Sequence, residues 1–152
     1  MRVEDFLRHS GVKFEKHEHP VAYTAQELAA LEHVSGDRVA KSVVVEADGK
    51  TALCVLAASC KVDLEKLCQV LGAKQCRLME ESEMAGMFPD VEVGAEGPFG
   101  GPYGMPTIVD ERLAACKTIT FAADTHHSAF RMNYDDYARL AEPRVADVSA
   151  HL

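Results

Sequence analysis

Lys41 is the residue whose type and position most directly suggest chemistry. Alternating apolar residues predict a strand over residues 38–47, which places Lys41 on the same face as Val43, Val45 and Ala47. An ammonium group is costly to bury among apolar side chains unless it reaches solvent, has a partner or serves a function. Two interpretations are open. The side chain extends to water along its apolar stem, or it supplies a cation for an anionic or carbonyl oxygen of a ligand.

A second candidate is the Gly/Pro-rich segment 90–106, which holds five of the ten glycines and three of the six prolines. Proline fixes backbone angles, whereas glycine allows a positive φ and a close approach of the backbone to a ligand. The composition predicts a structured loop suited to presenting backbone N–H groups. A surface connection without a function is an equally open interpretation.

His126 and His127 are adjacent between two predicted strands, so their rings should point to opposite sides. One ring could contact a ligand, and simple surface exposure is the alternative. No cysteine or carboxylate at a spacing typical of metal ligands accompanies them, so no metal site is predicted. Ser42, Ser59 and Ser128 lack the Gly-x-Ser-x-Gly context of a nucleophile, and no phosphate-binding or dinucleotide-binding loop is present. No cofactor is expected.

The size and charge of the chain limit the classes of function. A length of 152 residues fits one domain spanning residues 1–152, and 47% hydrophobic residues are typical of a folded protein. A net charge of −8 argues against a generally basic surface for DNA or RNA, so a nucleic-acid partner would need a local basic patch. No apolar run approaches the roughly 20 residues that span a bilayer, and the first residues lack a signal peptide. A cytoplasmic location without membrane contact is expected.

Hydrophobic spacing and capping residues predict the elements that must position these candidates. Thr24 and Glu27 form a capping box for a helix that ends at Ser35-Gly36. Asp48-Gly49 between apolar runs predicts a β-hairpin, and Asp63 begins a further helix. The other expected elements are helices near residues 3–10, 84–88 and 134–140 and strands near residues 12–17, 107–109, 118–122 and 130–132. Together they predict a mixed α and β domain with at least one antiparallel strand pair.

Four blocks in a fixed order carry a family resemblance: AKSVVV at residues 40–45, VLAASCKVDLEKL at 55–67, GAEGPFG at 94–100 and Val109-Asp110. They resemble the YbaK/EbsC family, which includes free-standing aminoacyl-tRNA deacylases and the editing domain inserted in bacterial prolyl-tRNA synthetases. The resemblance covers nearly the whole chain, and its specificity lies in the order of the blocks. It implies an α+β fold of one domain, with a mixed, mostly antiparallel sheet curled into a barrel-like core with surrounding helices.

The resemblance also implies roles for individual residues. Lys41 matches the family's lysine, which points into the pocket for the aminoacylated end of tRNA. Gly94 and Pro98 match a Gly-x-x-x-Pro loop, which places backbone amides near the substrate carbonyl. Lys41 and Gly94 are therefore the expected catalytic residues. A capping role explains Thr24 equally well, and Ala122 occupies the position of a histidine found in some editing members. The expected substrate contacts are Gly97, Pro98, Phe99, Ser42, Thr24 and His126.

The function that the resemblance implies is trans-editing, in which a hydrolase deacylates mischarged aminoacyl-tRNA. A small non-cognate amino acid on tRNA-Pro is the expected substrate. Water attacks the ester, a fixed cation and oriented N–H groups stabilise the developing charge, and no metal or covalent nucleophile is expected. The expected partner is the 3′ acceptor end of aminoacyl-tRNA, with an aminoacyl-tRNA synthetase as a further candidate. The alternatives are a noncatalytic member that binds tRNA or a synthetase, and a hydrolase of a free small ester or amide.

Overall fold

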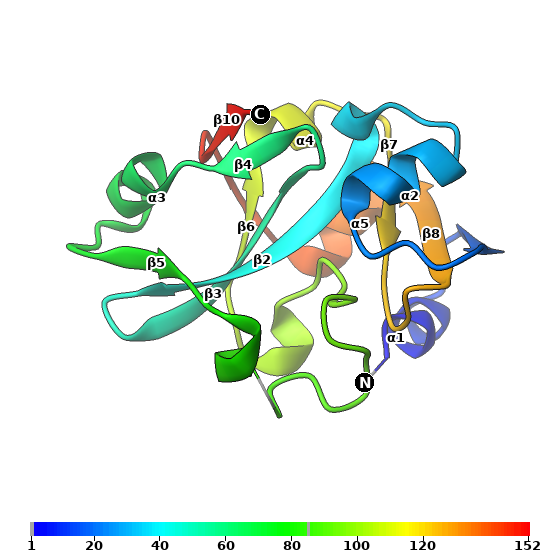
Figure 1. Cartoon of the computed structure of the whole chain (residues 1–152), viewed down its shortest axis with the longest axis horizontal. Helices are drawn as coiled ribbons and strands as arrows, with labels where there is room; N and C mark the ends of the chain where they lie inside the picture. The colour runs from blue at the N-terminus through cyan, green and yellow to red at the C-terminus, as the bar shows by residue number, and fades with distance from the viewer. Residues whose placement is uncertain (1, 85) are drawn as a thin grey trace.

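A mixed β-sheet forms the centre of the computed structural model of this chain, which describes residues 2–84 and 86–152 (Figure 1). Its strands are β1 (Phe14–Glu18), β2 (Val39–Ala47), β3 (Lys50–Ala57), β5 (Cys76–Leu78), β6 (Thr107–Asp110), β7 (Thr118–Ala122), β8 (Ser128–Asn133) and β9 (Arg144–Ala146). They pair in the order β1-β8-β7-β2-β3-β6-β9, with β5 added to β2. A separate two-stranded sheet pairs β4 (Cys60–Val62) with β10 (Ser149–His151).

Strand pairs in the large sheet are both parallel and antiparallel. The pairing is parallel between β2 and β7, between β3 and β6, and between β6 and β9, and the other pairs are antiparallel. This confirms the predicted mixed sheet of an α+β fold. In the described part of the chain no pairing joins β1 to β9, so the sheet path is open and the barrel-like curl stays a prediction.

The hairpin of β2 and β3 holds Lys41 opposite Leu56. Asp48 and Gly49 in its turn have φ angles of 49° and 84°. Two consecutive positive φ angles are what a tight two-residue hairpin turn requires, which confirms the Asp-Gly prediction. Residues 52–57 of β3 are all buried, as expected for a strand that is covered on both faces.

The edge of β2 that faces away from β3 has different neighbours along its length. β7 pairs with it only at Val39 and Ala40, and β5 pairs with it at residues 45–47. The N–H of Met79 also donates to the carbonyl oxygen of Val44, at 3.0 Å. Between Ala40 and Val44 this edge has no strand neighbour among the described residues, and Lys41 lies in that interval. β5 and β7 accordingly lie at opposite ends of β2 (Figure 1).

The α-helices of the described ranges are α1 (Val3–Ser10), α2 (Ala25–Leu31), α3 (Leu64–Leu71), α4 (Glu111–Ala114) and α5 (Tyr134–Ala141). N-cap side chains mark the start of α2, α3, α4 and α5, whereas the N-cap residue of α1 makes no such hydrogen bond. Thr24 caps α2 by accepting from Glu27 N at 3.0 Å, and Asp63 caps α3, which confirms both predicted caps. α2 ends earlier than predicted because His33 adopts a left-handed φ of 56°, and Ser35 instead caps a separate 3-10 turn, Gly36–Arg38.

Two further 3-10 turns shape the long connection between β5 and β6. Glu81–Met84 takes the place of the helix predicted near residues 84–88, of which Ala85 lies outside the described residues. Gly101–Tyr103 lies inside the Gly/Pro-rich segment. Among the helices of residues 2–84 and 86–152, none is long and apolar enough to cross a membrane.

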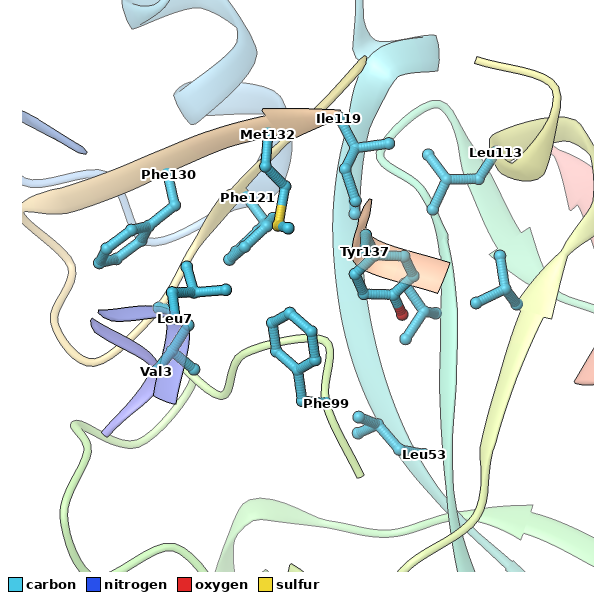
Figure 2. Close-up of a cluster of buried hydrophobic side chains, with 14 of the residues drawn as sticks. Val3, Leu7, Leu53, Phe99, Leu113, Ile119, Phe121, Phe130, Met132 and Tyr137 are labelled. Carbon is cyan, nitrogen blue, oxygen red and sulfur yellow. The ribbon is translucent and has the colours of Figure 1, made fainter. Parts of the chain in front are cut away.

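A large hydrophobic cluster joins α1, β7, β8 and α5 to the Gly/Pro-rich segment (Figure 2). Phe99 is 2% exposed, and its ring centroid lies 5.1 Å from that of Phe6, 6.0 Å from that of Phe121 and 5.1 Å from that of Tyr137. The Tyr137 hydroxyl donates to the carbonyl oxygen of Pro98 at 2.7 Å. The Gly/Pro-rich segment is therefore anchored in the core.

Gly97 lies where the Gly/Pro-rich segment meets α1, and we predict that its lack of a side chain is needed for stability. A Cβ atom at Gly97 would overlap Val3 Cγ2 and lie 3.3 Å from Ala123 Cβ. Gly97→Ala should therefore lower the free energy of unfolding by about 1–3 kcal/mol, measured by urea denaturation. Gly101→Ala is the matched control, because a Cβ there meets no atom of the described residues within 4 Å. Equal unfolding midpoints for the two variants would contradict this close approach.

Candidate active site

A pocket of about 470 Å³ lies beside the interval of β2 whose outer edge has no strand neighbour among the described residues. Its walls come from the start of α2, from β2, from the end of β7 and from the loops that carry Gly94 and His126. This volume suits a small molecule or one end of a larger ligand. Much of the wall is apolar, because five of the lining residues are alanines: Ala22, Ala25, Ala40, Ala58 and Ala122.

Most of the predicted site residues meet in this pocket although they are far apart in the sequence. Those that line it are Thr24, Lys41, Ser42, Gly94 and His126. The other predicted substrate contacts are buried outside its lining, in the packing around α1 and Tyr137: Gly97, Pro98 and Phe99. The two ends of the Gly-x-x-x-Pro motif therefore lie in different surroundings, with Gly94 exposed and Pro98 in the core.

Lys41 is half-buried in the wall of the pocket. Its neighbours on the same face of β2, Val43 and Val45, pack in a cluster with Leu56 and Cys60, which confirms the predicted apolar face. Burial is the main cause that lowers the pKa of the Lys41 ammonium, and the nearby Cys60 opposes the shift. No carboxylate among the described residues forms an ion pair with Lys41. The pocket therefore holds a partly desolvated cation that forms no ion pair with any described carboxylate.

His126 is fixed against the loop that carries Gly94. Its Nε2 lies 2.8 Å from the carbonyl oxygen of Val93, and its backbone N–H donates to Glu92 Oε1 at 2.8 Å. A carbonyl oxygen only accepts hydrogen bonds, so Nε2 carries a hydrogen and Nδ1 is the acceptor of the neutral ring. The Tyr23 ring packs against the imidazole, with 4.9 Å between centroids. These contacts hold the imidazole as one wall of the pocket.

Gly94 has a backbone conformation and surroundings that favour glycine. Its φ is 89°, and a Cβ atom there would lie 3.2 Å from His126 Cε1. Its N–H donates to Glu96 Oε1 at 3.1 Å. The Glu96 carboxylate therefore accepts a hydrogen bond from the same Gly94 N–H that the family resemblance places near the substrate carbonyl. The carboxylate must move before this N–H can meet a ligand.

Four polar lining residues were not predicted as site residues from the sequence: Tyr23, Gln26, Glu81 and Glu96. The position of Glu96 inside the Gly-x-x-x-Pro loop is the signal that could have found it, whereas nothing in the sequence brings Glu81 close to this loop. Tyr23 is 70% exposed and precedes the helix cap, so its ring stands at the pocket without being part of the core. In the described ranges, no group of three His, Cys, Asp or Glu side chains could hold a metal ion.

The arrangement suits binding and polarisation of a small polar group. Within residues 2–84 and 86–152, Ser42 forms no hydrogen bond with a histidine or carboxylate. No described side chain is therefore placed to activate it as a nucleophile. A partly desolvated cation and a backbone N–H can stabilise negative charge on an oxygen, and the two carboxylates can bind a cationic group.

Comparison with known proteins identifies relatives across most of the chain. A family model described as an aminoacyl-tRNA editing domain matches residues 19–140. Proline–tRNA ligase of Leuconostoc citreum (strain KM20) is 27% identical over 141 residues, which are 91% of this chain and 24% of the ligase. The chain therefore spans about a quarter of the length of this curated relative.

Solved structures share the fold. A structure described as a candidate trans-editing enzyme for prolyl-tRNA synthetase matches with a TM-score of 0.85 and 23% identity, covering 97% of this chain and 94% of that one. The structure of a hypothetical protein matches with a TM-score of 0.88 and 21% identity, covering 97% of this chain and 99% of that one. At these identities the likeness establishes the fold alone.

We predict that the Lys41 amine loses its proton at a lower pH in the folded protein than in the urea-unfolded chain, because burial disfavours its charged form. Between the two midpoints folding releases a proton, so the free energy of unfolding rises with pH in that window. NMR titration of ¹³C-methylated lysines measures both midpoints, and Lys41→Ala identifies the resonance. A folded-state midpoint equal to or above the unfolded one would contradict a desolvated amine.

Proposed function

Because the chain belongs to the aminoacyl-tRNA editing domain family, we propose that it hydrolyses the ester bond of mischarged aminoacyl-tRNA. The observation that carries the proposal is that Lys41 and Gly94, which the family resemblance names as catalytic, line one small pocket. A pocket of about 470 Å³ accommodates the end of a tRNA rather than a longer stretch of nucleic acid. The 3′ acceptor end is therefore the proposed ligand.

The proposed reaction is attack of water on the ester carbonyl. A bond forms between the water oxygen and the acyl carbon, the bond from that carbon to the ribose oxygen breaks, and the ribose oxygen takes up a proton. Lys41 stabilises the negative charge that develops on the carbonyl oxygen, and the Gly94 N–H adds a second donor once Glu96 moves away. In this proposal the rate enhancement comes from positioning and electrostatic stabilisation, and no covalent intermediate forms.

The proposed substrate is a small non-cognate amino acid on tRNA-Pro. The similarity to proline–tRNA ligase and to the candidate trans-editing enzyme supports this tRNA. The alanines of the wall give a small side chain apolar surroundings. A synthetase that relies on binding alone discriminates poorly between amino acids that differ by one methylene. Hydrolysis of the mischarged tRNA supplies the remaining discrimination. A prolyl-tRNA synthetase is the proposed macromolecular partner.

A deacylation panel tests the activity and the site together. Glycyl-, alanyl-, seryl-, cysteinyl- and prolyl-tRNA-Pro are incubated with the native chain, with Lys41→Ala and with Lys50→Ala. Lys41→Ala should lower the rate roughly 10²–10³-fold, because it removes the charge that stabilises the transition state. Lys50→Ala removes an exposed lysine at the start of β3 and should keep the native rate.

The outcomes of this panel separate the enzyme from its site. If no ester is hydrolysed faster than in buffer, the deacylase proposal fails and a noncatalytic binding member of the family becomes the better explanation. If Lys41→Ala keeps the native rate on a substrate that the native chain cleaves, the assignment of Lys41 is wrong while the activity stands.

Salt dependence distinguishes a tRNA from a free small ester. The kcat/KM for aminoacyl-tRNA should fall steeply between about 50 and 200 mM salt, because contacts with phosphates release counter-ions. The same measurement on an amino-acid methyl ester is the control, since a ligand without phosphates should respond little. An equally flat response for both would favour the small-ester alternative, for which the net charge of −8 is an argument.

A further inference from the structure

We propose that Glu81 and Glu96 recognise the α-ammonium group of the aminoacyl substrate, an inference that rests on the proposed deacylase function. Both carboxylates line the pocket that contains Lys41. They come from the connection between β5 and β6, whereas Lys41 comes from β2. The pocket therefore has two groups of opposite charge supplied by different elements.

The two carboxylates flank Gly94. Glu96 Oε1 accepts a hydrogen bond from Gly94 N at 3.1 Å, and Glu81 Oε1 lies 3.9 Å from the point where a Cβ atom of Gly94 would be. Neither carboxylate forms an ion pair with a lysine, arginine or histidine in the part of the chain that the structure describes. Their negative charges are thus available to a ligand at the point where the catalytic N–H is expected.

The chemistry of an aminoacyl ester matches this distribution of charge. Its α-amino group has a reference pKa of about 7.7–8.0 and is largely cationic at neutral pH. One carbon separates this group from the ester carbonyl, so a ligand whose carbonyl meets Gly94 brings its ammonium close to the same residue. Lys41 is the only lysine or arginine among the described lining residues, and it repels a second cation. The ammonium is therefore directed to Glu81 and Glu96.

Binding of the ammonium would also free the Gly94 N–H. Glu96 accepts a hydrogen bond from this N–H in the structure. When the carboxylate turns to the substrate ammonium, it exchanges a hydrogen bond to a neutral amide for one to a charged donor, which is the stronger kind. The Gly94 N–H is then released to the ester carbonyl oxygen. Binding of the substrate ammonium by Glu96 and release of the Gly94 N–H to the ester carbonyl therefore occur together.

The test compares esters that differ only in the charged group. Glycyl- and alanyl-tRNA-Pro are paired with glycolyl- and lactyl-tRNA-Pro, in which a hydroxyl replaces the ammonium group at nearly the same volume. Each rate is divided by the spontaneous rate of the same ester in buffer, because an ammonium group itself activates the ester. The corrected kcat/KM for the aminoacyl ester, divided by that for the matching hydroxyacyl ester, measures the preference for the ammonium group.

The variants are Glu81→Gln, Glu96→Gln and the double variant, with Glu15→Gln as control. Glutamine keeps the shape of the side chain and an oxygen that can accept from Gly94 N, and it removes the charge. Glu15 is an exposed carboxylate on β1 outside the pocket lining, so its variant changes the net charge equally. Urea unfolding midpoints establish that the variants are folded.

We expect the native chain and Glu15→Gln to prefer the aminoacyl esters at least about tenfold, and the double variant to lose that preference because its kcat/KM falls much further on the aminoacyl esters than on the hydroxyacyl esters. A native chain without preference, or a double variant that keeps it, overturns the inference and leaves the deacylase function intact. Equal losses on both kinds of ester also overturn it, because Glu81 or Glu96 would then act on the reaction itself. Absence of any hydrolysis overturns the proposed function and this inference together.

Discussion

The burial of Phe99 is the interaction on which the geometry of the pocket depends. Its ring contacts Phe6, Phe121 and Tyr137, and the carbonyl oxygen of the preceding Pro98 accepts from the Tyr137 hydroxyl. A segment so rich in glycine would lose much conformational entropy on folding. Burial of an aromatic ring provides free energy that offsets this cost. The segment is thus fixed after Gly97, and Gly94 can remain exposed at the pocket in a defined place.

Asp124 connects this anchored segment to the rest of the site. Its backbone N–H donates to the carbonyl oxygen of Ala95, and its carbonyl oxygen accepts from Glu92 N, both at 2.9 Å. Its buried carboxylate accepts from Val3 N at 2.8 Å, at the first turn of α1. The residue therefore joins α1 to the loop beside His126. The hydrogen bonds of Asp124 join backbone groups and one buried carboxylate, so they do not depend on the conformation of exposed side chains.

The elements with local signals were predictable from the sequence, and those that depend on distant partners were not. The Asp48-Gly49 turn and the Thr24 and Asp63 caps were found because their residue types meet a local backbone requirement. The strands β4, β5, β9 and β10 have three residues each, too few to show a period. They exist because partner strands lie beside them. Their short sequences alone do not specify them.

The same distinction applies to the site. Lys41 was identifiable because a charge among alternating apolar residues conflicts with the strand pattern. Gly97, Pro98 and Phe99 belong to the same motif as Gly94, but a sequence does not show whether a loop residue faces a ligand or the core. Glu81 is brought to the pocket by the path of a connection that has no periodic pattern. Its role therefore depends on tertiary structure that no local rule contains.

The interval of β2 between Ala40 and Val44 has a consequence for how this pocket is studied. A strand edge without a neighbour presents peptide groups, and peptide groups are unchanged when side chains are replaced. An alanine scan across this strand would remove the side-chain groups of Lys41 and Ser42, which line the cavity, and leave the peptide groups of the strand unchanged. Recognition by that main chain would be visible only to methods that alter or observe the backbone itself, such as amide-to-ester replacement or hydrogen exchange.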